Sequence, residues 1–450
     1  MPAKAERSLK IAVAALVALT ALSLLGPAYR SFFLFDINLN EAWYAYHAQA
    51  ILDSRPLYPT ADQLITNNYP PLSFYVMALL LKLAGSPIWA GRLLSFAALT
   101  CLALEIFLIL RMLGVRARFS LIATLSYLAT MGRLFDDFVW VNDYQLLAHA
   151  VMTLGFLCFL HARAAGSRWF IGPVLLMVLA GFFKHNIVAM PVAAVLILAS
   201  ENRMNAVRFT AVGVALASFG LLTCVLYFGP EFISNVFAPR PYTAFRSLKA
   251  LEDLHKVPVQ FIAWALYATT MKDGSRGRIV NILCAAGFLE SIVTRGAEEV
   301  HYNAGFDLVI ALHLGFGVAL DRICKFGIAD RWGASALRAL IVAGIAVRLL
   351  LGGASDAFHV LYSAAFRDRL AVAAATTIEE ANRVRALPGD VFCESLLICY
   401  LAGKPFVVDP INVQLRISVG ALPADILDRR LSTGDLTYVG VNPKALVGNR

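Results

Sequence analysis

Three carboxylates and one basic pair are the side chains of this sequence whose types and positions could perform chemistry. Asp36 and Glu41 follow a long apolar run, within the stretch FDINLNEAWYAYHAQAIL. Asp143 lies in a second polar stretch, VNDYQLLAHA, and Lys184 and His185 lie in a third, GFFKHNIVAMP. A carboxylate can accept the proton of an attacking hydroxyl group, and a lysine can bind a phosphate as a point charge. Such a set could support a transfer reaction if the fold places it together.

The composition of the chain is that of a membrane protein. Hydrophobic residues make up 59% of the 450 residues and charged residues only 15%, and the mean hydropathy is +0.68. These values exceed what the core of a water-soluble protein requires. The net charge of +9 does not indicate nucleic-acid binding, because no basic, aromatic-rich module accompanies it and membrane proteins collect Lys and Arg in cytoplasmic loops.

Apolar runs of sufficient length predict the membrane spans. A span needs about 20 mostly apolar residues, and shorter helices occur inside large bundles. The sequence therefore predicts about eleven transmembrane helices, at residues 10–29, 87–112, 119–134, 145–162, 169–183, 187–200, 206–228, 257–271, 279–294, 303–322 and 335–353. The first run has no clean small-residue cleavage pattern, which favours a span over a signal peptide. We expect an α-helical polytopic membrane protein.

Basic residues alternate between the predicted loops and define the topology. Clusters such as Arg111, Arg116 and Arg118 mark every second loop as cytoplasmic by the positive-inside rule. The candidate acids and the pair Lys184 and His185 lie in the intervening loops, which face the other side. We therefore expect a multi-pass membrane protein with its N-terminus in the cytoplasm and its C-terminus on the opposite side. The membrane we expect is the bacterial inner membrane, whose opposite side is the periplasm.

The first outer loop predicts two interfacial helices. They are the aromatic-rich segment EAWYAYHAQAIL, with Asn40 as its expected N-cap, and the segment LSFYVMALLLKLAG, which follows Tyr69-Pro70-Pro71. A rigid proline pair suits an extended entry into the second of these helices. The loop would thus hold polar groups over the membrane surface.

The tail of the chain predicts a separate small domain. Helical segments alternate there with the strand-like segments VFC, PFVVD and LTYVGV. This order predicts an extracytoplasmic α/β domain at residues 354–450, after a transmembrane domain at residues 1–353. Cys393 and Cys399 could form a disulfide there, or remain two buried thiols. We interpret the tail as a cap or an acceptor-binding domain, because it carries no glycine-rich phosphate loop.

Several motifs occur in a fixed order that resembles a known superfamily. They are NEAWYA at residues 40–45, NYPPL at residues 68–72 and the pair Gly91-Arg92, followed by VNDYQLLAHA and GFFKHNIVAMP. This order resembles the GT-C superfamily of membrane glycosyltransferases, in the branch of the protein O-mannosyltransferases and the bacterial aminoarabinose transferase. The resemblance covers residues 10–325. One departure is that Asn40 stands where the family usually has its first acid.

The resemblance implies transfer of a sugar from a polyprenyl-phosphate donor to a cell-envelope acceptor, on the extracytoplasmic face of the membrane. Asp36 or Glu41 would then be the catalytic base, and Asp143 would orient the acceptor or the sugar. Residues expected to bind the donor phosphate or the substrate are Tyr69, Arg92, Lys184, His185, Arg240 and His301. We expect no cofactor. Some relatives use a divalent metal, but the spacing of these residues gives no metal signature.

Plainer roles and a second function compete with this interpretation. Each acid could be a solvated loop residue, which is the preferred role for Asp136 and Asp137, and Lys184 could be an interfacial anchor. A lipid or glycolipid flippase is the alternative function, because ionisable groups and broken helices are also expected there. No internal repeat is visible, and the polar residues gather on one face, which favours an enzyme. The sugar, the stereochemical outcome and the acceptor, whether glycolipid, polysaccharide or protein, stay open.

Overall fold

Long apolar runs form the helices of the membrane part, because a helix satisfies its own backbone hydrogen bonds where no water is available. The computed structural model describes residues 2–325, 333–351 and 356–447. The helices of the membrane part are α1 (Pro2–Arg30), α4 (Pro87–Met112), α5 (Ala117–Leu134), α6 (Gln145–Ala164), α7 (Ile171–Phe183), α8 (Ala189–Ala199), α9 (Arg203–Phe228), α13 (Pro258–Thr270), α14 (Gly274–Arg295), α15 (Phe306–Arg322) and α17 (Ala334–Leu351). Shorter helices that connect them are η1 (Asp136–Phe138), α10 (Glu231–Val236), α11 (Ala244–Ser247), α12 (Lys249–Asp253), η2 (Leu254–Lys256), η3 (Tyr302–Gly305) and η4 (Ile323–Lys325).

Over the described residues, each predicted span coincides with one of these helices, and residues 352 and 353 of the last span lie outside the described residues. Within the described residues, seven helices are long and apolar enough to cross a bilayer, and they are α1, α4, α6, α9, α14, α15 and α17. Shorter apolar helices are α7, α8 and α3 (Leu72–Ala84). The predicted α-helical polytopic fold is thereby confirmed, whereas the count of eleven crossings stays a prediction.

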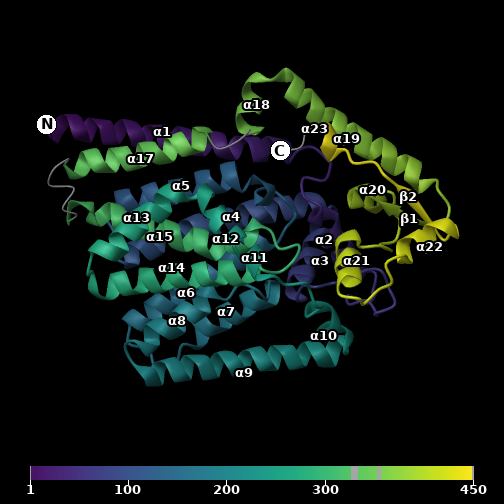
Figure 1. Ribbon diagram of the computed structural model, residues 1–450, viewed down its shortest axis with the longest axis horizontal. Helices are drawn as coiled ribbons and strands as arrows, with labels where there is room; N and C mark the ends of the chain where they lie inside the picture. The colour runs from purple at the N-terminus through teal and green to yellow at the C-terminus, as the bar shows by residue number, and fades with distance from the viewer. Residues whose placement is uncertain (1, 326–332, 352–355, 448–450) are drawn as a thin grey trace.

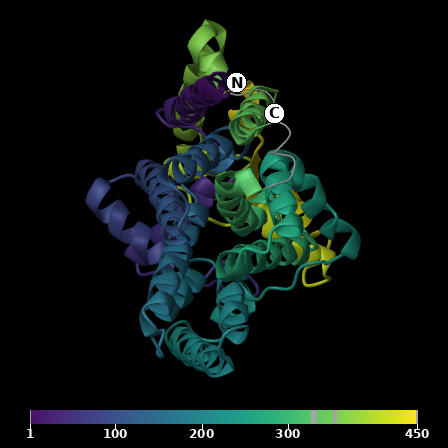
Figure 2. The same ribbon diagram turned by 90° about the vertical axis from the view of Figure 1, so that its left-hand side faces the viewer.

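The bundle is built around α15, and α9 lies along its edge (Figure 1). The apolar segment of α15 is 89% buried, whereas that of α9 is only 11% buried. A helix that is apolar all round belongs inside a bundle, or against lipid. In the view along the bundle, α9 again lies at one edge, and α1 lies at the opposite edge (Figure 2). The exposed apolar side chains of α9, such as Phe219 and Leu226, suit contact with lipid chains.

The C-terminal lobe, residues 356–447, is a small α/β unit at one end of the bundle (Figure 1). Its two strands pair in parallel, from Asp390 opposite Leu436 to Cys393 opposite Val439. The elements of the lobe are α18 (Asp356–Tyr362), α19 (Ala364–Arg385), β1 (Asp390–Cys393), α20 (Leu396–Leu401), α21 (Pro410–Ser418), α22 (Ile426–Ser432), β2 (Leu436–Val439) and α23 (Lys444–Val447).

The predicted strand PFVVD has a different role from the other two. Its Val408 forms a single isolated parallel bridge with Leu64 of the first outer loop, outside the sheet of β1 and β2. The backbone N–H of Asp409 also donates to the Leu64 carbonyl at 2.8 Å. The prediction of a sheet strand at this segment was therefore wrong, because its backbone groups pair with the loop that the lobe covers.

The first outer loop forms α2 (Asn40–Leu52) and α3, as predicted. Asn40 is the first residue of α2 rather than the expected N-cap, and the Asn38 side chain accepts its backbone N–H at 3.0 Å. α2 is more enclosed than an interfacial helix, since Tyr46 is only 6% exposed. The lobe covers this helix, and the ring of Tyr46 stacks on that of Phe406 at a centroid distance of 4.9 Å.

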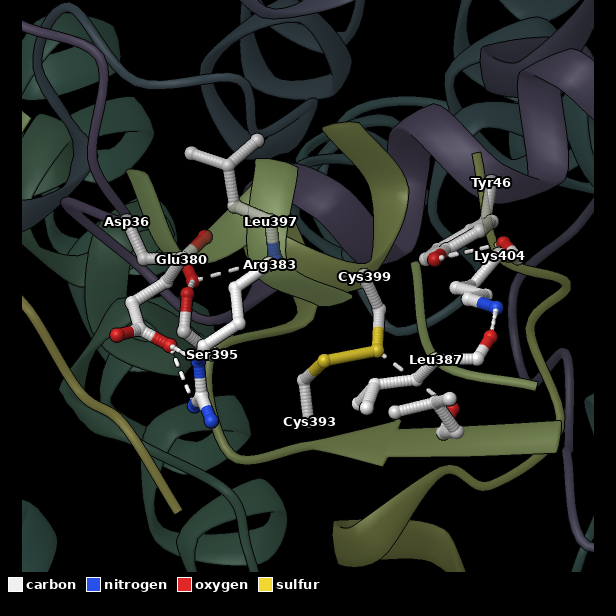
Figure 3. Close-up of a disulfide and its surroundings, with 11 residues drawn as sticks. Asp36, Tyr46, Glu380, Arg383, Leu387, Cys393, Ser395, Leu397, Cys399 and Lys404 are labelled. Carbon is white, nitrogen blue, oxygen red and sulfur yellow. Dashed lines mark hydrogen bonds and ion pairs between the residues drawn. A yellow bond between two sulfur atoms is a disulfide. The ribbon is translucent and has the colours of Figure 1, made fainter. Parts of the chain in front are cut away.

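A disulfide between Cys393 and Cys399 stabilises the side of the lobe that faces α2 (Figure 3). Cys393 ends β1 and Cys399 lies in α20, so the bond joins the strand to the helix that follows it. The structure thus shows the first of the two alternatives for these cysteines. Glu394 and Ser395 lie within the closed loop, which restricts their movement relative to the sheet.

Candidate active site

A cavity of about 1070 Å³ lies where the helix bundle meets the C-terminal lobe. Its wall contains residues from the segments 37–43, 68–69, 137–145, 184–186, 236–240 and 294–304 of the membrane part, and from 392–444 of the lobe. The polar stretches that the sequence places in separate loops therefore meet at one cavity. Its volume slightly exceeds the usual range of about 300–1,000 Å³ for small-molecule sites, which suits two substrates.

Five of the predicted site residues line this cavity, and they are Tyr69, Lys184, His185, Arg240 and His301. The other four are buried outside its lining, and they are Asp36, Glu41, Arg92 and Asp143. The structure thus brings most of the expected phosphate-binding residues together. The expected acids lie behind the wall, where each has its own partners.

Glu41 and Arg92 form a buried ion pair that fixes the first outer loop to α4. Nε and Nη2 of Arg92 each lie 2.8 Å from one oxygen of the Glu41 carboxylate. The guanidinium group also donates to the backbone carbonyls of residues 31, 33 and 35. The carboxylate accepts two further N–H groups, from Ile37 and Asn142, both at 3.0 Å. Both side chains are at most 1% exposed, so this geometry favours a positioning role.

Gly91 precedes Arg92 for a steric reason. A Cβ atom at this position would lie 1.9 Å from Oδ1 of Asn142. The Asn142 side chain is held there, because its Nδ2 donates to the Glu41 carbonyl at 2.8 Å. The Gly91-Arg92 motif is therefore a packing requirement of the loop that carries Glu41.

Asp36 connects the first outer loop to the lobe (Figure 3). Its Oδ2 accepts the Ser395 hydroxyl at 2.5 Å and the backbone N–H of Leu397 at 3.4 Å, at the start of α20. Asp36 is 1% exposed. This burial raises the pKa of its carboxyl group from 3.8 to about 7, although the Ser395 hydrogen bond acts in the opposite direction. The Asp36 carboxyl group thus joins the first outer loop to the lobe, and this group titrates near neutral pH.

The raised pKa of Asp36 predicts a pH dependence of stability. Between about pH 4 and pH 7 the folded protein retains a proton that the unfolded chain releases, so the free energy of unfolding falls as the pH rises. The Asp36→Asn variant cannot titrate at this position and should lack that decline, which for one proton approaches ~1.4 kcal/mol per pH unit. Unfolding in mixed micelles at several pH values measures it.

A control for this experiment is Asp428→Asn, which changes an exposed acid of α22. It should keep the wild-type pH profile. Parallel profiles for the wild type and Asp36→Asn would show that Asp36 does not titrate in this range.

Asp143 lies behind two amide side chains of the cavity wall. Its Oδ2 accepts Nδ2 of Asn40 at 3.4 Å, and its Oδ1 accepts the backbone N–H of Gln145 at 2.7 Å. Asn40 and Gln145 both line the cavity, and Oε1 of Gln145 accepts Nδ2 of Asn303 at 3.0 Å. Asp143 therefore fixes the orientation of Asn40 and the start of α6.

Lys184 presents a cation to the cavity at the end of α7. Its Nζ donates to the Tyr69 hydroxyl at 3.4 Å and lies 4.9 Å from the centroid of the Tyr69 ring. In the part of the chain that the structure describes, this hydroxyl is its only hydrogen-bond partner, and Lys184 is 5% exposed. A buried ammonium group with one long hydrogen bond is suited to bind an anion that enters the cavity.

His185 faces the same cavity as a neutral group. His185 is exposed at the cavity surface, and partial loss of solvation there lowers the pKa of its imidazole, an effect to which the charges of Lys184 and Arg240 add. The imidazole can therefore donate one hydrogen bond and accept one at pH 7. The positive charge at this position comes from Lys184.

Arg240 and His301 line the cavity from two other segments. Nη1 of Arg240 donates to the Glu298 carbonyl at 3.4 Å, which leaves other guanidinium donors for a ligand. Nε2 of His301 lies 3.9 Å from the Glu299 carboxylate, and the side chain is 67% exposed. Arg240 is thus the better placed of the two to supplement Lys184.

Asp137 is a cavity residue that the sequence analysis did not select. The adjacent Asp136 is buried and paired with Arg30, with 3.4 Å between Oδ2 and Nη1. Asp137 instead lines the cavity, and its Oδ2 accepts the Tyr302 hydroxyl at 3.0 Å. Nδ2 of Asn38 donates to its carbonyl at 3.4 Å, which ties Asp137 to the first outer loop. The sequence does not distinguish these two neighbouring acids. Because they are successive residues of η1, their side chains point in different directions.

Carboxylate and imidazole groups such as those near the cavity can act as ligands of a metal ion. Among the described residues, no group of three or more His, Cys, Asp and Glu side chains is arranged to hold a metal ion. The expectation of a metal-independent site stays a prediction.

A family model agrees with the predicted superfamily. The model described as dolichyl-phosphate-mannose-protein mannosyltransferase matches residues 68–228, which include Tyr69, Arg92, Asp137, Asp143 and Lys184. No curated protein matches the chain significantly in sequence.

Solved structures show the fold. ArnT from Cupriavidus metallidurans in the apo state is similar with a TM-score of 0.60 and 12% identity, over 94% of this chain and 90% of that chain. The structure of ArnT bound to undecaprenyl phosphate gives 0.58 and 12%, over 91% and 87%. The oligosaccharyltransferase of Archaeoglobus fulgidus gives 0.56 and 12%, over 89% of this chain and 65% of that chain. The predicted GT-C fold of a multi-pass membrane protein is thereby confirmed.

Proposed function

We propose that the chain is a membrane glycosyltransferase that moves a sugar from a polyprenyl-phosphate donor to a hydroxyl group of a cell-envelope acceptor. The GT-C fold supports this reaction class. The similarity to ArnT, which was solved with undecaprenyl phosphate, supports a lipid phosphate as the donor group. Transfer of a hexose and transfer of a pentose are both compatible with the cavity.

The observation that carries the proposal is one cavity that contains both a cation and a carboxylate. Lys184, with Tyr69 and the neutral His185, offers hydrogen-bond donors and charge to a phosphate. Asp137 offers a carboxylate to an acceptor hydroxyl in the same cavity. The cation and the carboxylate lie in one cavity at the end of the bundle, where a donor and an acceptor could meet, so this arrangement favours transfer over flipping.

In the proposed reaction, the Asp137 carboxylate accepts the proton of the acceptor hydroxyl while its oxygen attacks the anomeric carbon of the donor. A new bond forms between this oxygen and the anomeric carbon, and the bond from that carbon to the phosphate oxygen breaks. The electron pair leaves with polyprenyl phosphate, whose charge Lys184 and Arg240 stabilise.

The predicted acids take positioning roles in this proposal. Glu41 holds the first outer loop against Arg92, and Asp36 holds the same loop against the lobe. Asp143 orients Asn40, the residue at the position of the family's first acid. Asp137 would then take over the proton transfer for which Asn40 has no basic group.

The proposal includes a location for the reaction. The loops that carry Asp137 and Lys184 would face the periplasm of a bacterial inner membrane, with the N-terminus in the cytoplasm. Residues 1–353 would form the transmembrane domain and residues 354–450 the periplasmic domain. Envelope acceptors and lipid-linked donors meet on that side.

Removal of the cation tests the donor site. Lys184→Ala should weaken binding of polyprenyl phosphate by about 10- to 100-fold, because a hydrogen bond to a charged group contributes about 1.5–3 kcal/mol. Calorimetric titration of the protein in lipid nanodiscs with polyprenyl phosphate measures the dissociation constant. At saturating donor, the rate should change less than the affinity.

The matched control is Lys82→Ala, which removes an exposed lysine of α3 outside the cavity. Its affinity for polyprenyl phosphate should equal that of the wild type. If Lys184→Ala also binds with wild-type affinity, Lys184 is an interfacial anchor and the proposed donor site is wrong.

A further inference from the structure

We infer that the C-terminal lobe carries a binding subsite for an uncharged carbohydrate acceptor, formed by Glu394, Tyr438 and Asn442. The inference rests on the proposed function, because it names the acceptor class for the same cavity. All three side chains line the cavity from the lobe side. They have no part in the proposed binding of the donor phosphate or in the proton transfer.

The position of these residues in the lobe is that of a ligand site. β1 and β2 are parallel, so their carboxyl ends lie at the same edge of the sheet. Glu394 directly follows β1, Tyr438 lies near the end of β2, and Asn442 follows soon after it. Ligands of parallel α/β sheets bind outside the carboxyl ends of the strands. In this lobe that edge faces the cavity.

The three side chains form one hydrogen-bonded group. Oε1 of Glu394 accepts Nδ2 of Asn442 at 3.1 Å, and Oε2 accepts the Tyr438 hydroxyl at 3.4 Å. The ring of Tyr438 is 49% exposed and lies 5.3 Å from that of Phe392. Carboxylate and amide oxygens accept hydrogen bonds from sugar hydroxyls, and the amide donates in return. An exposed aromatic face packs against the apolar face of a sugar ring.

The charge of the subsite disfavours an anionic ligand. Lys444, the basic residue that the lobe contributes to the cavity wall, donates to the Ile37 carbonyl at 2.7 Å and is thus engaged. A phosphate or carboxylate group beside Glu394 would be repelled. A lipid chain would remove water from the carboxylate and the amide without replacing their hydrogen bonds, which is unfavourable. A neutral sugar satisfies both requirements.

The backbone around Glu394 is fixed from two sides. Its N–H donates to the Val439 carbonyl at 2.9 Å, and the disulfide between Cys393 and Cys399 closes the loop that contains it (Figure 3). The hydroxyl group of the next residue, Ser395, donates a hydrogen bond to the Asp36 carboxyl group. A site held in this way loses little conformational entropy when a ligand binds.

Binding of simple glycosides tests the subsite. Saturation-transfer NMR would be recorded for methyl glycosides of neutral hexoses and pentoses, and for a blocked serine- and threonine-rich peptide, with the wild-type protein in nanodiscs. We expect transfer to one or more glycosides and none to the peptide. Glu394→Ala and Tyr438→Ala should each reduce the signal at least fivefold, and Tyr438→Phe should reduce it less, because the ring stays. Tyr362→Ala, an exposed tyrosine of α18 outside the cavity, is the matched control and should keep it.

The outcomes separate this inference from the proposed function. Glycoside signals that survive in both Glu394→Ala and Tyr438→Ala, or transfer to the peptide alone, would overturn the subsite. If the wild type binds polyprenyl phosphate but no glycoside, the subsite is wrong while the donor proposal stands. If it binds glycosides at Glu394 but no polyprenyl phosphate, the subsite stands and the donor proposal is wrong.

Discussion

Asp137→Asn should reduce the rate of sugar transfer by about 10²- to 10⁴-fold, the usual contribution of a positioned general base. The substitution keeps the size of the side chain and one oxygen that can accept the Tyr302 hydroxyl. What it removes is the ability to take a proton. The affinity for polyprenyl phosphate should therefore change little, because the carboxylate contacts Tyr302 whereas Lys184 contacts Tyr69. Initial rates at saturating donor and acceptor measure the effect.

Two further variants test whether the loss of rate is specific to the Asp137 carboxylate. Asp428→Asn removes an exposed acid of the lobe and should leave the rate unchanged. Asp143→Asn should reduce the rate by a smaller factor than Asp137→Asn, because Asp143 acts through Asn40. A larger loss for Asp143→Asn than for Asp137→Asn would transfer the role of the base to Asp143.

Glu41→Ala should lower the free energy of unfolding by about 3–5 kcal/mol, because it leaves the buried Arg92 guanidinium without its carboxylate. The N–H groups of Ile37 and Asn142 would lose their acceptor as well. Equilibrium unfolding in mixed micelles measures the difference. The first outer loop carries one wall of the cavity, so activity should fall together with stability.

The control for this change is an exposed ion pair of the same helix region. Arg55 and Asp53 lie 2.8 Å apart with side chains 47% and 40% exposed, so Asp53→Ala should cost at most about 1 kcal/mol. Glu41→Gln keeps the shape and part of the hydrogen bonding, and it should fall between the two. If Glu41→Ala is as stable as the wild type but inactive, Glu41 acts in the chemistry itself.

The helices and their common polar end were predictable from the sequence, because apolar length and the alternation of basic loops depend on local composition. Tyr69, Lys184 and Arg240 lie in loops that the alternation predicts on one side of the membrane, and all three line one cavity, but their role in binding stays a prediction. The order of short motifs predicted the superfamily, and the similarity of the fold to that of ArnT agrees with it.

The partners of the acids could not be predicted. Glu41 and Arg92 are separated by 51 positions in the sequence, and Asp36 and Ser395 by 359. No local sequence pattern therefore indicates either contact. The different partners of the adjacent residues Asp136 and Asp137 could not be predicted either, because the direction of a side chain in η1 depends on how the whole loop packs. The burial of α2 could likewise not be predicted from the sequence, since the lobe that covers this helix lies far along the chain.

The measurement that tests the account most directly uses a polyprenyl-phosphate sugar labelled separately in the sugar and in the lipid, with protein in nanodiscs and an envelope extract as acceptor. We predict that labelled sugar enters the extract and labelled polyprenyl phosphate is released in equal amounts, with the wild type and Asp428→Asn but not with Asp137→Asn. Intact donor under all conditions, while the protein in sealed vesicles moves the labelled lipid across the bilayer, would contradict glycosyl transfer and establish a flippase.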